Sequence, residues 1–186
     1  MNILVDKLPT EYEGLKINTN FRSFILFELL MQDNKINKED KIALAINLFY
    51  EEVPKDIKKA IDGVLWFYTR GKELKQKNSK NGNNEKQKRI YSFEHDAELI
   101  YTAFLDQYNI DLNEIDQLHW FKFKAMFEGL KSDNKICEIM GYRAINVNKI
   151  KDKEEQKRYK KLQKEWALPD ERSDEEKEQD FANSFW

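Results

Sequence analysis

The sequence predicts an all-α protein, a compact multi-helix bundle of about six to seven helices, and three observations support this. Glycine and proline are scarce, with 6 and 3 residues, and 35% of the chain is charged, a composition that favours helices over sandwiches or barrels. Apolar side chains recur at helical spacing along most of the chain. Good capping residues stand before several of these stretches.

Length and charge exclude several classes of protein. At 186 residues we expect one domain with appendages, whose core needs no metal or disulfide to close. The net charge of −2 gives no overall attraction to nucleic acid or to membranes. Cys137 is the only cysteine, which excludes an intrachain disulfide and is typical of a reducing cytoplasm. We read no signal peptide at the start, and no apolar run approaches the ~20 residues that span a bilayer.

The chain divides into three parts. An irregular N-terminal arm (residues 1–19) precedes a helical domain (20–168), and an acidic, aromatic tail (169–186) follows. Within the arm, Ile3–Val5 and Leu15–Ile17 are separated by turn residues, so they form either a short hairpin or an arm that lies on the body.

The first half of the domain predicts three helices. The first starts near Asn18 or Thr19, ends at about Gln32, and is apolar over more than half its circumference, so it is buried on several sides. The second spans 38–51, with Asn37 as its cap. The third has Pro54 in its first turn, and Gly71 is its stop.

A hydrophilic stretch at 72–89 interrupts this pattern. It carries seven basic residues, two acidic ones and a single apolar residue, Leu74. Such a segment has too little apolar surface to order itself, so it predicts a mobile basic loop.

The second half predicts four more helical segments. Ser92 caps an amphipathic helix from Phe93 to Tyr108, and a helix at 114–131 is apolar nearly all round and therefore central. A short helix at 135–141 and an extended stretch at 144–147 follow. Asp152 with Glu155 makes a capping-box-like start for a basic helix at 153–166.

The residues that carry reactive chemistry do not form a recognisable catalytic or metal-binding set. Side chains of adjacent helical residues point ~100° apart, so Glu94, His95 and Asp96 do not converge without a ligand from elsewhere. A two-histidine metal site requires His95 and His119 to face each other, which spacing does not decide. We interpret His95 as lying at a helix edge, His119 as a core or interface residue, and Cys137 as a small core residue. We therefore expect no cofactor, no metal and no catalytic residue.

Two charged regions leave alternatives open. The basic stretch at 149–164 contains only Tyr159 as an aromatic residue, so we interpret it as a solvated face. The alternatives are contact with nucleic acid and charge pairing with the acids of 170–180, which have the opposite sign. At the end of the tail, Phe181, Phe185 and Trp186 are either a docking motif for another protein or an end that folds back on its own core.

Ordered blocks of residues resemble one protein family. They are Phe21-Arg22, Phe27–Met31, Ala60–Tyr68, Gly71-Lys72, Phe93–Ala97, Ile100–Phe104, Ile110–Leu112, Leu118–Trp120 with Phe123, Ile139-Met140 and Tyr142-Arg143. Together they resemble the phage "Gp fifteen" family, found in tail-gene clusters of phages and prophages of Gram-positive bacteria. This family often has a second Trp where the present chain has Phe121. The resemblance covers roughly residues 20–169, so the tail lies outside it.

The resemblance implies a function in tail assembly. It places the gene between those of the tail tube and the tape measure, and proteins from that position are thought to act as chaperones in the host cytoplasm. The implied partners are the tape-measure protein, the tail-tube protein and further copies of the chain itself, with no membrane or nucleic-acid partner and no enzymatic activity. One alternative is a structural component of the phage tail. Another is a protein that inhibits or triggers a host defence protein through its own C-terminal segment (169–186).

A chaperone of this kind offers grooves in which an amphipathic helix lies. Aromatic residues off the main apolar stripes of their helices are the candidates for lining such grooves. They are Phe27, Trp66, Phe67, Trp120 and Phe121, and the tail adds Phe181, Phe185 and Trp186 as partner-binding candidates. Complete burial of all five helical candidates in the monomer would contradict this hypothesis.

Overall fold

A computed structural model describes residues 2–72 and 89–169 of the chain. Within these ranges the fold is all-α, as predicted, with one very short antiparallel sheet. The elements are β1 (Glu11–Tyr12), β2 (Leu15–Lys16), α1 (Phe21–Gln32), α2 (Lys38–Phe49), α3 (Ile57–Tyr68), α4 (Ala97–Tyr108), α5 (Trp120–Glu128), α6 (Lys135–Ala144), a 3-10 helix (Val147–Lys149) and α7 (Lys153–Glu165).

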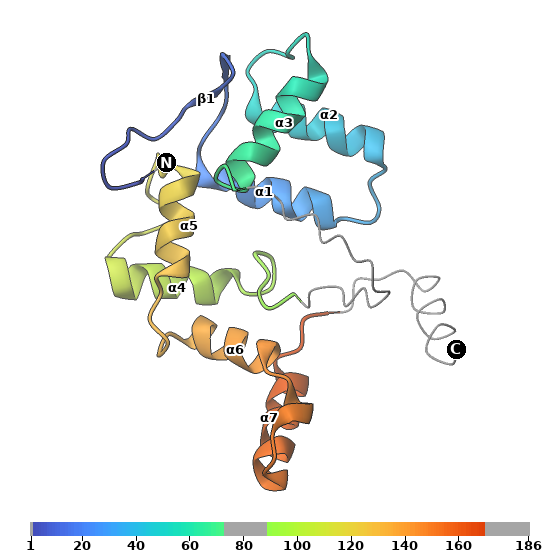
Figure 1. The fold of residues 1–186 in the computed structure, drawn as a ribbon, viewed down its shortest axis with the longest axis vertical. Helices are drawn as coiled ribbons and strands as arrows, with labels where there is room; N and C mark the ends of the chain where they lie inside the picture. Colours follow the sequence, from blue (N-terminus) through green and yellow to red (C-terminus); the bar gives the residue numbers. More distant parts are fainter. Residues whose placement is uncertain (1, 73–88, 170–186) are drawn as a thin grey trace.

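The helices form two groups that α5 joins. Helix α2 packs against both α1 and α3, and α5 also packs against both α1 and α3. On the other side α4 packs against α6, and α6 packs against α7, which projects away from the body (Figure 1). Helices α1 and α4 run in opposite directions (Figure 1).

Several helix boundaries follow from their caps. The side chain of Asn37 accepts a hydrogen bond from the Asp40 N–H at 2.9 Å, which confirms the predicted start of α2. Asp152 accepts from the Glu155 N–H at 2.7 Å at the start of α7, also as predicted. Helix α3 begins later than expected, with Asp56 as its cap, so the prediction that Pro54 lies in its first turn is wrong.

The arm and the segment after α6 correct two further expectations. The hairpin pairs Glu11–Tyr12 with Leu15–Lys16, so of the two alternatives for the arm, a hairpin between Ile3–Val5 and Leu15–Ile17 is wrong. Helix α6 continues to Ala144 rather than ending at 141, and a 3-10 helix at Val147–Lys149 replaces part of the predicted extended stretch.

Helices α4 and α5 begin several residues later than their sequence patterns predict. The hydroxyl of Ser92 does cap, but it accepts from the N–H groups of Glu94 and His95 in a turn, and α4 starts only at Ala97. Helix α5 starts at Trp120 instead of 114, because the preceding residues pair with the start of α1. The Phe21 N–H donates to the Leu118 carbonyl at 2.9 Å, and the Trp120 N–H donates to the Thr19 carbonyl at 2.8 Å.

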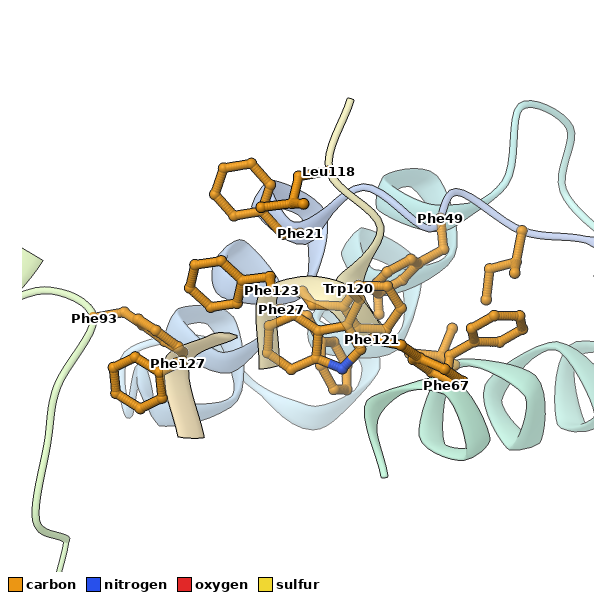
Figure 2. Packing of buried hydrophobic residues seen from close by; sticks show 14 of the residues in the cluster. Phe21, Phe27, Phe49, Phe67, Phe93, Leu118, Trp120, Phe121, Phe123 and Phe127 are labelled. Atoms are coloured by element: carbon orange, nitrogen blue, oxygen red, sulfur yellow. The ribbon is translucent and has the colours of Figure 1, made fainter. Parts of the chain in front are cut away.

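The core is a continuous cluster of aromatic rings centred on α5 (Figure 2). Phe123 is fully buried and lies at its middle. Its ring centroid is 5.0 Å from those of Phe21 and Phe104, and 5.7 Å from that of Trp120. Trp120 also stacks on Phe24 at 5.0 Å, and its indole N–H donates to the Tyr68 carbonyl at 3.2 Å. The central position predicted for this helix is therefore correct.

A buried ion pair fixes the C-terminal helices. The guanidinium of Arg143 on α6 contacts both carboxylate oxygens of Asp96 at 2.6 and 3.0 Å. It also donates to the Ile90 carbonyl at 3.1 Å and, through Nε, to the Trp166 carbonyl at 2.6 Å. Both side chains of the pair are almost fully buried. One side chain therefore ties α6 to the start of α4 and to the end of α7.

Two predicted segments lie largely outside the described residues. Of the basic loop predicted at 72–89, only Lys72 and Arg89 are described, and of the tail predicted at 169–186, only Pro169. In the part of the chain that is described, no helix has the length and apolar character to cross a membrane.

Candidate protein-binding groove

A mostly apolar cavity of about 400 Å³ lies open to the surface between α1 and α4. Its lining residues come from four separate segments of the chain: α1, the 93–101 segment, the 112–113 loop and α5. They are Phe21, Arg22, Ile25, Phe93, Ala97, Glu98, Ile100, Tyr101, Leu112, Asn113 and Phe123. We call this cavity the α1–α4 groove.

The floor of the groove is aromatic. Phe21, Phe93 and Phe123 are each buried to 6% exposure or less. The rings of Phe21 and Phe123 stack at 5.0 Å, and the Phe93 centroid lies 6.0 Å from that of Phe123. These contacts anchor the floor in the main core, so the bottom of the groove is rigid.

The walls carry partly exposed apolar side chains. Ile25 forms the α1 wall, and Ala97 and Tyr101, one helical turn apart, form the α4 wall. Ala97 is exposed, while Ile25 and Tyr101 are half-buried. Apolar surface that a monomer leaves open above a rigid aromatic floor is typical of a site that binds another protein segment.

Arg22 holds the end wall of the groove in place. Its guanidinium donates to the carbonyls of Leu112, Asn113 and Ile115 at 2.7, 3.2 and 2.8 Å. The loop that carries Leu112 is therefore fixed to the first turn of α1. The guanidinium carbon also lies 4.9 Å from the centre of the Phe21 ring.

Polar groups on the same loop are paired with each other. Tyr101 donates its hydroxyl to Asp111 at 3.0 Å, and Asp111 accepts from the Asn113 N–H at 2.8 Å. The bond from the Asn113 N–H is the main reason why the pKa of Asp111 lies below its usual value. The hydrogen bond that Tyr101 donates to Asp111 has the opposite effect on Tyr101, whose pKa it raises. This end of the groove is therefore a hydrogen-bonded turn that orders the Tyr101 ring.

A second cavity, of about 660 Å³, continues the groove toward the end of α1. It is bordered by Leu29 and Leu30, which lie about one turn beyond Ile25, and by Glu94 and His95, which precede the Ala97 wall. Pro169, the last described residue of the chain, also borders it. The two cavities thus follow one another along α1, and we call them together the α1–α4 seam.

The groove is not formed by the aromatic residues that the sequence singled out. Phe27, Phe67, Trp120 and Phe121 are buried to 6% exposure or less, and Figure 2 shows them packed within the core. The expectation that these four side chains line an open groove is therefore wrong, because their helices are covered on several sides. Trp66 alone stays half-exposed, with its ring 5.8 Å from that of Tyr12 on the hairpin.

The remaining candidates, Phe181, Phe185 and Trp186, lie outside the described residues. The structure instead points to Ile25, Ala97, Tyr101 and Leu112, which the sequence pattern assigns to ordinary core faces or turns. Their helical spacing is visible in the sequence, but the gap between α1 and α4 is not.

The two histidines lie at opposite ends of α1. His119 pairs with Asn20, just before α1, whereas His95 borders the second cavity together with the last turn of α1. Helix α1 has twelve residues and is about 18 Å long, so two side chains at its opposite ends do not form a common metal site. Among the described residues, no group of three or more His, Cys, Asp or Glu side chains is placed to hold a metal ion.

His119 has a structural role at the start of α5. Its Nδ1 accepts from the Phe121 N–H at 3.1 Å, and its Nε2 lies 2.9 Å from the Pro9 carbonyl. A carbonyl only accepts, so Nε2 carries a proton, and Nδ1 carries none because it accepts, so the ring is neutral. Burial lowers the pKa of His119, which favours this neutral form.

A partly buried polar cluster lies outside the lining of the groove, and its members contact one another. The carboxylate of Glu28 accepts from the Tyr68 hydroxyl at 2.8 Å. The ammonium of Lys124 lies 5.4 to 5.5 Å from the ring centroids of Tyr91, Trp120 and Phe127, and burial lowers its pKa. These contacts join α1, α3 and α5 and are explained by packing.

Comparison with known proteins places the chain in a family. A sequence model of the family described as Bacteriophage Gp15 protein matches residues 4–168. Neither the curated proteins nor the solved structures contain a match. The family match includes every residue of the α1–α4 groove and ends where the acidic tail begins. It covers most of the chain, and the chain therefore belongs to the Bacteriophage Gp15 protein family.

Proposed function

We propose that this phage protein is a tail assembly chaperone whose α1–α4 groove binds an amphipathic helix of the tape-measure protein. Membership of the Gp15 family favours a structural or tail-region protein of a phage. The observation that carries the binding function is the groove itself, because it exposes apolar side chains above a buried aromatic floor. We propose binding without catalysis and activity in the host cytoplasm.

The groove has the dimensions of a helix-binding site. Its α1 side extends from Phe21 to Gln32 when the second cavity is included, which is about 17 Å of helix. A bound helix with apolar residues at i, i+4 and i+7 places them over about 10 Å. Two to three anchors of a partner helix therefore fit between the ends of the seam.

The chemistry of the groove suits a reversible contact. Its rim carries Arg22, Glu98 and Asn113, so both signs of charge surround the apolar centre. A small apolar site with a polar rim gives a weaker interface than a large hydrophobic one, which is what a chaperone that later releases its client requires. The tape measure is the proposed client because a long helical protein with apolar seams needs such cover before it is packed inside a tube.

Co-expression with the neighbouring tape-measure protein tests the proposal. We expect the two proteins to co-purify, and we expect Ala97→Glu to abolish this by placing a carboxylate in the groove. Ala97 is exposed at the first position of α4, where an acidic residue is favourable for the helix, so the variant should fold. Ala43→Glu, at an exposed position of α2 outside the groove, is the matched control.

Co-purification that survives Ala97→Glu would show that the groove is not the binding site. Absence of any complex with the tape-measure protein would contradict the proposed client. Mass spectrometry of purified virions separates a chaperone from a structural tail component, since a chaperone should be missing from the mature particle.

A further inference from the structure

The described part of the chain ends at the open end of the α1–α4 seam. Pro169 borders the second cavity beside Leu29 and Leu30. Its position is fixed from inside the fold, because the Arg143 Nε donates to the Trp166 carbonyl at 2.6 Å and Arg143 is buried against Asp96. The seventeen residues that follow, 170–186, therefore leave the domain at a defined place.

The sequence of these residues separates into a charged part and an apolar part. Residues 170–180 contain seven acidic and two basic side chains, which favour solvent. Phe181 and Phe185 follow at a spacing of four, which places both rings on one face if the segment is helical. This is the anchor pattern that an apolar groove between helices accommodates.

The distances allow the aromatic end to reach the groove. The α1 face between Leu29 and Phe21 is about 12 Å long. Phe181 lies twelve positions after Pro169, and a flexible segment of that length has a typical end-to-end distance of roughly 20 Å. The linker is thus long enough to pass the second cavity, and short enough to keep the aromatic residues near the groove at roughly millimolar effective concentration.

We propose that residues 170–186 fold back along the α1–α4 seam and place Phe181 and Phe185 in the groove, so that the tail of the same chain occupies the binding site. Ile25 and Tyr101 contact the aromatic rings, and the acidic run crosses the second cavity. The tail lies beyond the match to the family, which ends at residue 168. If the groove also binds the tape-measure helix, as the proposed function has it, residues 170–186 compete with that helix for the groove.

Photo-crosslinking in the full-length protein tests the docking without any partner. Phe185 is replaced by p-benzoylphenylalanine, the purified protein is irradiated, and the crosslinked peptides are identified by mass spectrometry. We expect intramolecular crosslinks to α1 around Ile25 and to α4 around Tyr101. Adding Ala97→Glu should remove most of these crosslinks, whereas adding Ala43→Glu should leave them unchanged.

Crosslinks that join two copies of the chain, or that reach other surfaces only, would overturn the proposal. Crosslinks to α1 and α4 that persist in Ala97→Glu would overturn it as well. Since no tape-measure protein is present, failure here is independent of failure of the co-purification experiment. If both proposals hold, replacing Phe181 and Phe185 by serine should raise the affinity for the tape-measure protein. The gain would be about tenfold if the tail leaves the groove open one-tenth of the time.

Discussion

The ion pair between Arg143 and Asp96 gives the most specific stability prediction. Replacing Arg143 by methionine removes four hydrogen bonds, two to Asp96 and one each to the carbonyls of Ile90 and Trp166. The Asp96 carboxylate keeps the Ser92 N–H at 2.9 Å but is only 3% exposed, so its charge is left almost uncompensated. Removing one partner of a buried pair costs about 3–5 kcal/mol.

Urea unfolding followed by circular dichroism measures this cost. We expect Arg143→Met and Asp96→Asn each to lower the free energy of unfolding by about 3–5 kcal/mol. For a domain of this size that corresponds to a fall in melting temperature of roughly 6–20 °C. The double variant should lose much less than the sum of the two, because it leaves no unpaired charge buried.

Arg158→Met is the matched control for the change of side chain. Arg158 is exposed on α7, and its replacement should change the unfolding free energy by no more than about 0.5 kcal/mol. If Arg143→Met costs less than about 1 kcal/mol, or if the two single effects simply add, the pair does not hold the C-terminal helices together as argued.

Two further predictions concern α5. His119→Asn keeps a side-chain acceptor for the Phe121 N–H but no longer titrates. The pKa of His119 is lowered in the fold, so the wild type should lose stability as the pH falls below the ordinary value of 6.5, where the unfolded chain takes up the proton first. The variant should lose less between pH 7 and pH 5 in urea titrations, and equal losses would refute this role. Phe123→Ala should cost about 3–5 kcal/mol in the same assay, and Phe123→Leu less, because Phe123 is fully buried among five aromatic rings. Equal costs for the two variants would contradict the packing argument.

The helices that local chemistry determines were predictable from the sequence. Asn37 and Asp152 stand at the starts of α2 and α7 because each supplies a side-chain acceptor to its own first turn, and such bonds depend only on nearby residues. The all-α class likewise follows from composition and apolar spacing. The family resemblance, carried by ordered blocks along the chain, is confirmed by the match to residues 4–168.

The candidate site was not predictable for a physical reason. Helical periodicity shows which faces are apolar, but not which of those faces another helix covers. Phe121 and Phe67 are offset from the main stripes of their helices, yet both are fully buried because α3 and α5 pack against each other. Ile25 and Tyr101 lie on regular stripes, yet they remain half-exposed because α1 and α4 stand apart. Burial in this protein is decided by pairs of helices that are distant in the sequence.

The groove exists because two helices begin later than their apolar patterns predict. Had α4 started at Phe93, that ring would lie on the helical face it shares with Ala97, next to the groove wall. Instead, residues 92–96 form a turn, which Ser92 caps and which Arg143 holds through its contact with Asp96. In this turn Phe93 packs on Phe123 and forms part of the groove floor.

The same argument applies at the other end of the groove. Had α5 started at 114, the residues before Trp120 would continue the helix and move away from α1. The pairing of the Phe21 N–H with the Leu118 carbonyl holds them against α1, and Arg22 fixes the Leu112 loop as the end wall. Both interruptions of the helical pattern therefore build the groove. The Arg143 contacts that create the first one also place Pro169 at the end of the seam, so the binding site and the exit of the tail depend on one buried side chain.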